Sequence, residues 1–285
     1  MINMVKVTIK EAMEMHDSLQ QGHLYVTVDM LILTVREGKL TLLLSRRKDT
    51  PYAGRWALPG RFVGLDESAE TTVRNLLEEM LPVEKPFLEQ LYTFSEVNRD
   101  PRGRVISTAY LVIVPGKQLD ALMKEKQTPF TRFEVSTGDG GLRLAGENGT
   151  VLIGSDLAFD HGRIIETGVQ RLQGKIDYTV VGVRFLNDLN DFTLGELQTV
   201  FEAVLGRELD NSNFRRFIRS RYEETGRIVP TRQEEKQGRG RPAALYRMND
   251  KGGRGSGEMI VSSLLCLQWV ISLFDHSHQQ NCQKE

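Results

Sequence analysis

Residues 58–83, LPGRFVGLDESAETTVRNLLEEMLPV, decide how the N-terminal half of the chain is interpreted. A loop with proline and glycine comes first, and residues 67–81 then show the apolar spacing of an amphipathic helix. Asp66 or Ser68 can cap the start of this helix, because both side chains accept hydrogen bonds from free backbone N–H groups. The stretch therefore predicts a loop followed by an acidic helix.

Apolar, β-branched segments on both sides of this stretch predict strands. Residues 24–34 (LYVTVDMLILT) and 40–45 (LTLLLS) are separated by a short turn and indicate a hairpin. Residues 88–94 and 105–114 predict two further strands. The order strand, strand, helix, strand, strand favours an α+β fold or a mixed α/β sandwich.

The middle of the chain is less regular. Glycines punctuate short apolar runs between residues 117 and 155, which predicts one or two inserted β-hairpins. Residues 155–172 have amphipathic helical spacing, and Gly174 is expected to end that helix.

A second unit is expected to begin near Tyr178. Thr193 is suited to cap one helix, and residues 213–224 predict another. Strands are expected at 228–231 and 244–248, with a basic, Gly-rich segment between them. Helix, tight turn, helix and a hairpin with a basic tip is the layout of a winged helix-turn-helix.

Charge is unevenly distributed along the 285 residues. Residues 207–247 hold eleven Lys/Arg and six Asp/Glu, a net of +5, which leaves −6 for the rest of a chain whose total is −1. A basic unit on an acidic body is typical of a phosphate-binding module. The only two cysteines, Cys266 and Cys282, argue against a disulfide framework. With no signal-peptide pattern and no long apolar run, we expect a cytoplasmic protein without a membrane span.

Residues 58–83 resemble the Nudix box, which reads G, five residues, E, seven residues, then R-E-U-x-E-E-x-G-U with U aliphatic. Carboxylates on one face of its helix hold magnesium against a substrate diphosphate. In the register aligned through Glu67, the positions that depart from the box are Arg61, Asn75, Leu76, Met80 and Pro82. A second register uses Gly60, Asp66, Arg74, Glu78 and Glu79. The metal-binding set is incomplete in either register, which does not favour efficient hydrolysis.

Across residues 24–248 the chain resembles the NrtR family, the Nudix-related transcriptional regulators of bacterial NAD metabolism. The resemblance is carried by WALPGRFV (56–63), DES (66–68), LEQLYTF (88–94), NRDPRGRVIS (98–107), LAFDH (157–161), FTLGELQTVFEAVLGRELDNSNFRR (192–216) and GRGRPAALYR (238–247). It implies an α+β protein, a Nudix α/β/α sandwich followed by a winged helix-turn-helix domain. The expected domains are 1–177 (Nudix-like sensor), 178–249 (winged helix) and 250–285 (Gly-rich linker and apolar tail of unknown role). The Gly-rich insertion at 136–154 departs from the shorter members.

The resemblance implies an ADP-ribose sensor that has lost turnover, although related members respond to other metabolites, including sugars. Guanidinium groups match phosphate oxygens, and aromatic rings can stack a base or line a pocket. For this ligand site we predict Arg46, Arg47, Trp56, Phe62, Arg102, Arg104 and Tyr110. Core packing is the competing interpretation of Trp56 and Phe62, and His161 is expected to be structural.

DNA binding is predicted from the helix at 213–224 and the following hairpin tip. The helix separates apolar residues for the core from arginines for the major groove. The predicted DNA contacts are Ser212, Asn213, Arg215, Arg216, Arg219 and Arg221 on the helix, with Lys236, Arg239 and Arg241 in the tip. One such domain reads a half-site, so we expect a homodimer on a roughly palindromic operator.

Two functions are therefore predicted from the sequence. The first is a repressor whose Nudix domain senses ADP-ribose or a related metabolite, with no cofactor required. The second is an active ADP-ribose pyrophosphatase with an accessory basic domain, for which Glu67, Glu78 and Glu79 are the residual acids. Only this alternative needs Mg²⁺, and Glu79 is its candidate ligand.

Overall fold

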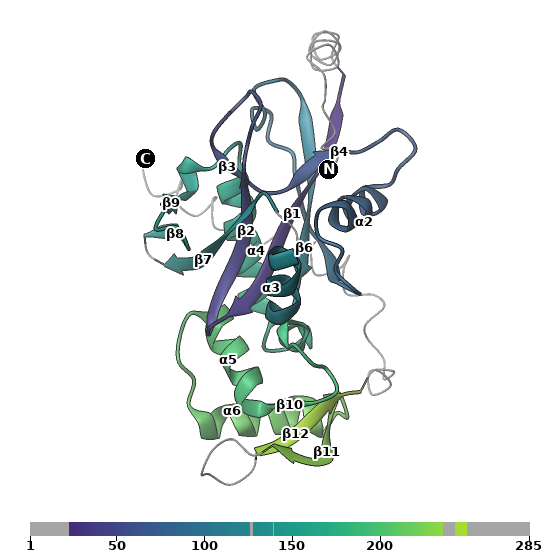
Figure 1. The fold of residues 1–285 in the computed structure, drawn as a ribbon, viewed down its shortest axis with the longest axis vertical. Coiled ribbons are helices and arrows are strands. Elements are labelled where there is room, and N and C mark those ends of the chain that lie inside the picture. Colours follow the sequence, from purple (N-terminus) through teal and green to yellow (C-terminus); the bar gives the residue numbers. More distant parts are fainter. Residues whose placement is uncertain (1–22, 126–127, 139, 236–242, 250–285) are drawn as a thin grey trace, which may run out of the picture.

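The computed structural model describes residues 23–125, 128–138, 140–235 and 243–249, with the backbone alone for 232–235. The described chain is elongated, with a large sheet at one end and a three-stranded sheet at the other (Figure 1). The order in the large sheet is β5-β6-β1-β2-β7-β8-β9, with β3 paired to β2 and β4 to β1. Its strands are β1 (Tyr25–Arg36), β2 (Lys39–Arg46), β3 (Trp56–Ala57), β4 (Gly60–Phe62), β5 (Phe87–Phe94), β6 (Val105–Ile113), β7 (Phe130–Gly138), β8 (Gly141–Gly146) and β9 (Val151–Ile153).

The four strands predicted around residues 58–83 are all present. β1 and β2 form the antiparallel hairpin, β6 runs parallel to β1, and β5 pairs antiparallel with β6. Each expected bound lies within two residues of the observed one. The apolar, β-branched content of these segments therefore identified the centre of the sheet correctly.

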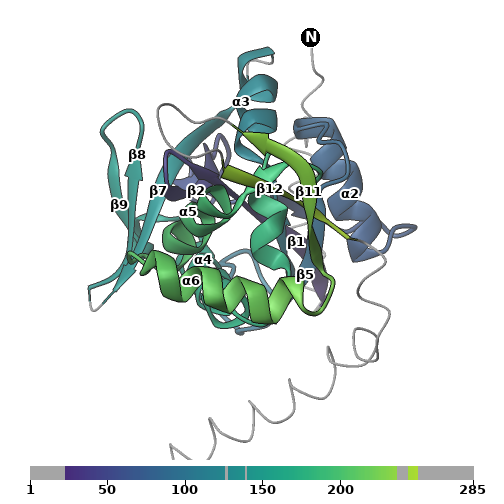
Figure 2. The same cartoon turned by 90° about the horizontal axis from the view of Figure 1, so that it is seen from below.

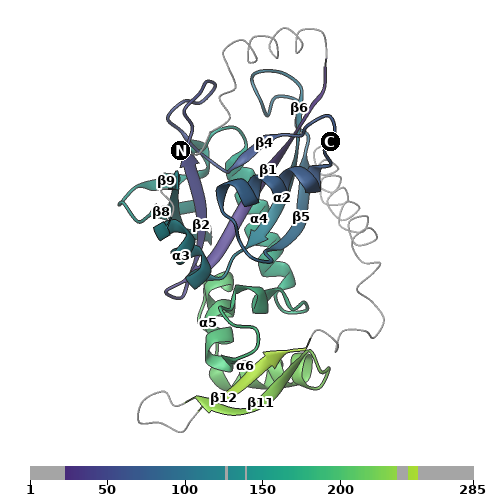
Figure 3. The same cartoon turned by 45° about the vertical axis from the view of Figure 1, so that its right-hand side comes forward.

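Helices cover both faces of this sheet. They are α2 (Ala69–Met80) and α3 (Gly116–Glu125) on one face, with α4 (His161–Lys175) and the 3₁₀ segment η2 (Val181–Phe185) on the other. Val28, Met30 and Ile32 of β1 pack in the α2 layer, whereas Leu31 and Leu33 pack in the α4 layer, because successive strand residues point to opposite faces. Figure 3 shows α2 in front of the sheet. The predicted α/β/α sandwich is confirmed.

The helix predicted at 155–172 is shifted toward the C-terminus. Residues 154–156 form a separate 3₁₀ turn, η1 (Gly154–Asp156), in which the Asp156 side chain accepts a hydrogen bond from the Ile153 N–H. α4 then begins at His161 and continues through Gly174, which was wrongly expected to end it. Gly168 lies at the closest approach to the sheet, where an added Cβ would stand 2.2 Å from Leu31 Cδ2.

The irregular region contains the expected hairpins and one helix that the sequence did not indicate. β7, β8 and β9 form an antiparallel meander at one edge of the large sheet. The described residues between 136 and 154 lie in these strands, in the turns between them and in the first residue of η1. α3 precedes them and buries Leu119 against the sheet. The helix was missed because its apolar face is narrow and its first residue is Gly116.

The C-terminal unit has the predicted winged-helix order. Its elements are β10 (Phe192–Thr193), α5 (Leu194–Leu205), α6 (Asn211–Ile218), η3 (Arg219–Glu223), β11 (Ile228–Glu235) and β12 (Ala243–Met248). Thr193 caps α5 as predicted. Asp210 caps α6, which begins at Asn211, two residues before the expected start at 213. η3 is a π-type turn that continues α6. Seen from below, α6 and the β11–β12 hairpin form the end face of the chain (Figure 2).

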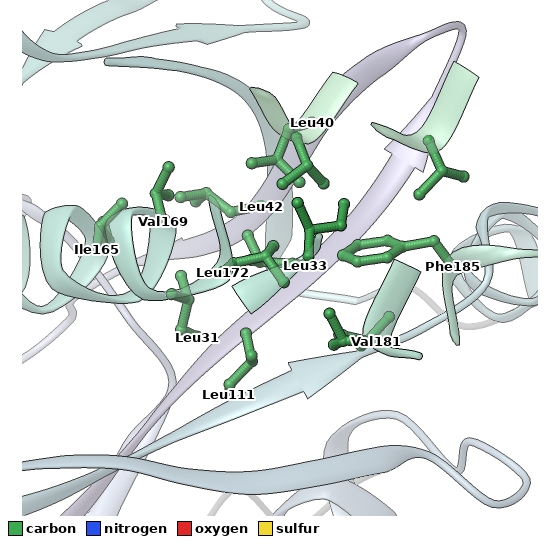
Figure 4. Close-up of a cluster of buried hydrophobic side chains, with 14 of the residues drawn as sticks. Leu31, Leu33, Leu40, Leu42, Leu111, Ile165, Val169, Leu172, Val181 and Phe185 are labelled. Carbon is green, nitrogen blue, oxygen red and sulfur yellow. The ribbon is translucent and has the colours of Figure 1, made fainter. Parts of the chain in front are cut away.

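A single apolar core joins the two units. It runs from Leu31 in β1 through α4 and η2 to Phe201 in α5 and Phe214 in α6. Figure 4 shows the part in which Val181 and Phe185 pack beside the sheet. The boundary expected near Tyr178 therefore separates two sequence units that share one interior.

Three predicted segments lie outside the described residues: the N-terminal 22 residues, the hairpin tip at 236–242, and the segment from 250 to 285. Among the helices that are described, none has the length and apolar character needed to cross a membrane.

Candidate functional site

Two of the predicted ligand-binding arginines converge on one aromatic ring. The Arg47 guanidinium lies 4.7 Å from the centre of the Phe159 ring, and that of Arg102 lies 5.4 Å from it. Arg102 is also 5.3 Å from the ring of Phe62. Phe159 itself has a left-handed backbone, with φ of 51°, a conformation that costs free energy for a residue with a side chain. We call Arg47, Arg102, Phe62 and Phe159 the arginine–aromatic cluster.

The cluster carries positive charge that its own acids do not fully neutralise. Arg47 donates to the carbonyls of Pro51 and Asp49 and forms no ion pair with a carboxylate within the described residues. Burial and the neighbouring Arg102 lower the pKa of Arg47. Arg102 donates to both oxygens of Asp100, at 3.0 and 2.7 Å. Two guanidinium groups with one carboxylate are suited to bind an anion.

Beside the cluster lies a buried ionic network that the sequence analysis did not identify. Arg99, with a side chain 3% exposed, donates to the two oxygens of Asp160 at 2.6 and 3.0 Å and lies 3.5 Å from Asp29. Asp29 also accepts from Ser107 Oγ at 2.5 Å. Asp29 is a charged residue within the buried stretch of β1, and that pattern was the available signal. The network ties β1, β6 and the start of α4 together.

His161 completes this network, and its structural role agrees with the expectation. Its Nδ1 accepts a hydrogen bond from the Leu58 N–H at 2.9 Å, so the proton of the neutral ring is on Nε2, which faces Asp29 at 3.5 Å. Burial lowers the pKa of His161 despite the opposite effect of Asp29 and Asp160. A neutral His161 therefore fixes the loop before β4 to the start of α4.

The other predicted ligand-binding residues do not join the cluster. Trp56 is buried and packs against Phe133, as the core interpretation expects, with the Arg46 guanidinium 4.9 Å from its ring. Tyr110 lies in the apolar layer under α2, on the opposite face of the sheet, where burial raises its pKa. Arg104 donates to the Ser95 carbonyl.

Two of the residual acids of the Nudix box, Glu67 and Glu79, form a small cluster around an arginine. Arg61 donates to both oxygens of Glu79, at 3.0 and 3.3 Å, and to Glu67 at 3.4 Å. Glu67 also accepts from Thr72 and Asn75, and these two hydrogen bonds lower its pKa. The contacts join residues of the first register of the box. Asp66, Arg74 and Glu78 of the second register are exposed and lie outside it.

These residues do not fit the divalent metal that a Nudix box implies. Among the described residues, no three His, Cys, Asp or Glu side chains gather in a way that could hold a metal ion. Arg61 already occupies oxygens of both surviving carboxylates, and a guanidinium has no lone pair to offer a metal. No chemical step can be derived through a metal at this place.

The predicted recognition helix exposes its polar residues as expected. Ser212, Asn213, Arg215, Arg216, Arg219 and Arg221 are all exposed. Arg215 and Arg216 are held by Asn211 and Asn213 at 2.9 and 3.0 Å, and none of the four arginines pairs with an acid in the described part of the chain. Phe214, Ile218 and Tyr222 face the core. The predicted Lys236, Arg239 and Arg241 lie outside the described residues.

One residue of this helix reaches the other unit. Tyr222 in η3 is 1% exposed, and its hydroxyl donates toward the carbonyls of Thr179, at 2.5 Å, and Ile176, at 3.3 Å. Both carbonyls follow the C-terminal end of α4. Burial raises the pKa of Tyr222, so the hydroxyl stays protonated as a donor. The sequence predicted an apolar face for this helix but indicated no partner for the Tyr222 hydroxyl.

Comparison with known proteins defines the class to which this arrangement belongs. The model of the NUDIX domain matches residues 24–133, and that of the NrtR DNA-binding winged helix domain matches residues 189–248. The chain is therefore a Nudix domain joined to a DNA-binding type of winged helix. It is 34% identical over 224 residues, 78% of this chain and 81% of the relative, to the ADPR responsive transcriptional repressor NtrR of Acinetobacter baylyi. The chain belongs to the NrtR family.

A solved structure and a second relative extend this comparison. The fold matches Shewanella oneidensis NrtR complexed with a 27mer DNA, with a TM-score of 0.62 and 30% identity, over 80% of this chain and 94% of that chain. The ADP-ribose pyrophosphatase of Methanocaldococcus jannaschii is 32% identical over 151 residues, 52% of this chain and 77% of the relative. The NrtR likeness includes both units, whereas the second relative matches about half of the chain.

Proposed function

We propose that this protein is a transcriptional repressor that binds operator DNA through α6 and releases it when its Nudix domain binds ADP-ribose or a related metabolite. The observation that carries the proposal is the set of exposed arginines on α6 and the adjoining η3, Arg215, Arg216 and Arg219. The other unit of the chain holds a half-buried cationic cluster. The similar proteins from Acinetobacter baylyi and Shewanella oneidensis support it. It acts where DNA is, in the cytoplasm.

The DNA interface follows from the exposure of α6. A helix whose apolar residues pack on α5 can place its opposite side in the major groove, while its arginines bind phosphates and base edges. One winged helix covers one half-site. A homodimer therefore binds a roughly palindromic operator.

The effector site follows from the arginine–aromatic cluster. Arg47 has no carboxylate partner in the described residues, so a diphosphate would supply the missing negative charge between Arg47 and Arg102. The ring of Phe159 under both guanidinium groups holds them in place. Binding there changes the charge balance directly before the first turn of α4.

α4 joins the effector site to the DNA-binding unit. At its start, Asp160 and His161 contact Arg99 and Leu58, and beyond its end the carbonyls of Ile176 and Thr179 hold Tyr222. A helix of 15 residues spans about 22 Å at 1.5 Å per residue. A displacement at its start therefore reaches the base of the recognition helix through one continuous element.

The test is fluorescence anisotropy of a labelled duplex from the region upstream of the protein's own gene, at one salt concentration, with and without ADP-ribose. Salt is held constant because phosphate contacts make affinity fall steeply with ionic strength. We expect specific binding that ADP-ribose weakens. Specific DNA binding that ADP-ribose does not change would support the DNA-binding part of the proposal and exclude ADP-ribose as the effector. Absence of specific binding to such fragments would contradict the role as a regulator.

Arg47→Ala separates the two sites in this assay. The variant keeps α6 intact, so its DNA affinity without effector should equal that of the wild type, while its response to ADP-ribose is lost. Arg104→Ala is the matched control, because Arg104 bonds a loop carbonyl away from the cluster and its removal should leave the response unchanged.

A second candidate function is hydrolysis of ADP-ribose, favoured by the similarity to the Methanocaldococcus jannaschii pyrophosphatase and by the remaining Glu67, Glu78 and Glu79. We propose that the repressor needs no cofactor, while hydrolysis would require Mg²⁺. Release of AMP that depends on Mg²⁺ and is lost in Glu79→Gln would establish this second function.

A further inference from the structure

In the first register of the Nudix box, two carboxylates survive, those of Glu67 and Glu79. Glu67 precedes α2 and Glu79 lies in its last turn, yet both face Arg61 of β4. The Arg61 and Glu67 side chains are each 28% exposed, so the contact is partly shielded from water, which strengthens it relative to a fully exposed pair.

The position of Arg61 is imposed by the sheet and not by the acids. β4 pairs antiparallel with β1, with Arg61 opposite Val28 and Gly60 opposite Asp29. Val28 packs in the layer under α2, so Arg61, which shares its face, points toward α2 as well. In the first register Arg61 stands where the Nudix box has glycine. A residue with no side chain is thus replaced by a cation directed at the acids.

The hydrogen bonds of Glu67 leave few free carboxylate lone pairs to bind a metal. Its Oε2 accepts from Thr72 Oγ1 at 2.8 Å and from Arg61 at 3.4 Å, and its Oε1 accepts from Asn75 at 3.0 Å. Both oxygens of Glu79 accept from Arg61. A divalent ion would have to break these contacts and approach a guanidinium of the same sign, with two carboxylates as its protein ligands.

We propose that Arg61 is a built-in counter-cation that takes the place of the divalent metal in this Nudix box, and that it excludes Mg²⁺ from the helix. Effector binding is then independent of divalent metal, a consequence that rests on the proposed function. The exclusion of metal does not depend on any effector. It requires only the geometry of Arg61, Glu67 and Glu79.

The test is a titration of the full chain with Mn²⁺, a spin probe for the Mg²⁺ site, with free Mn²⁺ measured by electron paramagnetic resonance. The wild type should bind no stoichiometric Mn²⁺, whereas Arg61→Gly should gain one Mn²⁺ per chain. Arg61→Gly/Glu79→Gln should lose the gained site. Arg74→Ala is the matched control, because Arg74 pairs with Glu70 on the same helix outside the cluster and its removal should create no site.

Stoichiometric Mn²⁺ binding by the wild type that Glu79→Gln removes would overturn the proposal. Failure of a folded Arg61→Gly to gain a site would overturn it equally. If Arg61→Gly does not fold, Arg61→Gln, which keeps the length but not the charge, takes its place with the same expectation. The Mn²⁺ titration contains neither ADP-ribose nor DNA. If the protein shows no response to ADP-ribose in the anisotropy assay, the proposed function is contradicted, while the Mn²⁺ result still tests the role of Arg61.

Discussion

In the Nudix domain Arg99 is 3% exposed and held by two aspartates, whereas Arg215, Arg216 and Arg219 of the winged helix are exposed with no acidic partner among the described residues. The sequence around both sets is similarly basic, since Arg99 belongs to NRDPRGR and Arg215 and Arg216 to NSNFRR. Burial and counter-charge separate them. An arginine enclosed with acids holds the fold, and an arginine without acids is free to bind an anion.

The largest expected effect comes from removing the buried Arg99 from its two aspartates, which we call the enclosed set. Arg99→Ala leaves Asp29 and Asp160 buried without their guanidinium, which should lower the free energy of unfolding by about 3–5 kcal/mol. Urea unfolding measures it. Arg163→Ala is the control, because Arg163 forms an exposed pair with Glu96 whose loss should cost about 0–1 kcal/mol. Equal losses in both variants would contradict the distinction.

For the exposed arginines of the winged helix we expect the opposite pattern, a loss of DNA affinity with little change in stability. Arg216→Ala or Arg219→Ala should weaken operator binding by about 1–3 kcal/mol, which is roughly five- to 150-fold. Each lost phosphate contact should reduce the salt slope by about 1. The free energy of unfolding should change by no more than about 0.5 kcal/mol, because these side chains bury no partner. Anisotropy titrations at several salt concentrations give both quantities. A large loss of stability would place these arginines with the enclosed set.

A smaller effect should appear where the two regions meet. Tyr222→Phe removes the donor to the Ile176 and Thr179 carbonyls, which should cost about 1 kcal/mol of stability. DNA affinity without effector should stay near the wild-type value, while the weakening by ADP-ribose is reduced. The readout is the ratio of Kd values with and without ADP-ribose. Tyr178→Phe changes an exposed tyrosine and serves as control; an unchanged ratio in Tyr222→Phe would exclude this hydrogen bond from the coupling.

The smallest effect is a pH dependence that belongs to the enclosed region alone. Burial holds the pKa of His161 below its ordinary value of 6.5, so the unfolded chain takes up a proton first as the pH falls. The contribution of neutral His161 to the free energy of unfolding should therefore be fully present above pH 6.5 and decline as the pH drops below it. His161→Asn keeps an acceptor for the Leu58 N–H without titrating, and its unfolding free energy should lack that decline. Parallel declines in both proteins would refute the assignment to His161.

Local patterns predicted most of the fold because local forces determine those elements. The β-branched content of β1 and the side chains of Ser68 and Thr193 mark a strand and two helix starts without reference to distant residues. The start of α4 was misplaced by six residues, since the Asp156 side chain and the Trp56–Leu157 bridge hold residues 154–157 outside the helix. The first is a local turn contact and the second a tertiary contact, and the apolar spacing of a helix encodes neither.

The candidate site was predicted only in part, and the reason is the same. Arg47 and Arg102 were chosen for their chemistry, and they converge because Phe159 lies between them. Tyr110 was chosen by residue type, but the register of β6 against β1 turns it to the α2 face. Arg99 acts through Asp160, 61 positions away, and Asp29 through Ser107, 78 positions away. Arg61 of β4 acts through Glu79 of α2, 18 positions away. Such pairings appear only once the chain is folded.

The shared interior of the two units has a consequence for protein engineering. Ile176, Val181 and Phe185 lie between the sensor and the DNA-binding unit, and each is at most 3% exposed. A chimera cut near Tyr178 would leave apolar surface bare on both fragments and favour aggregation. A DNA-binding unit that is transferred to another protein must therefore include α4 and η2. The smallest exchangeable part of this regulator is larger than its winged helix.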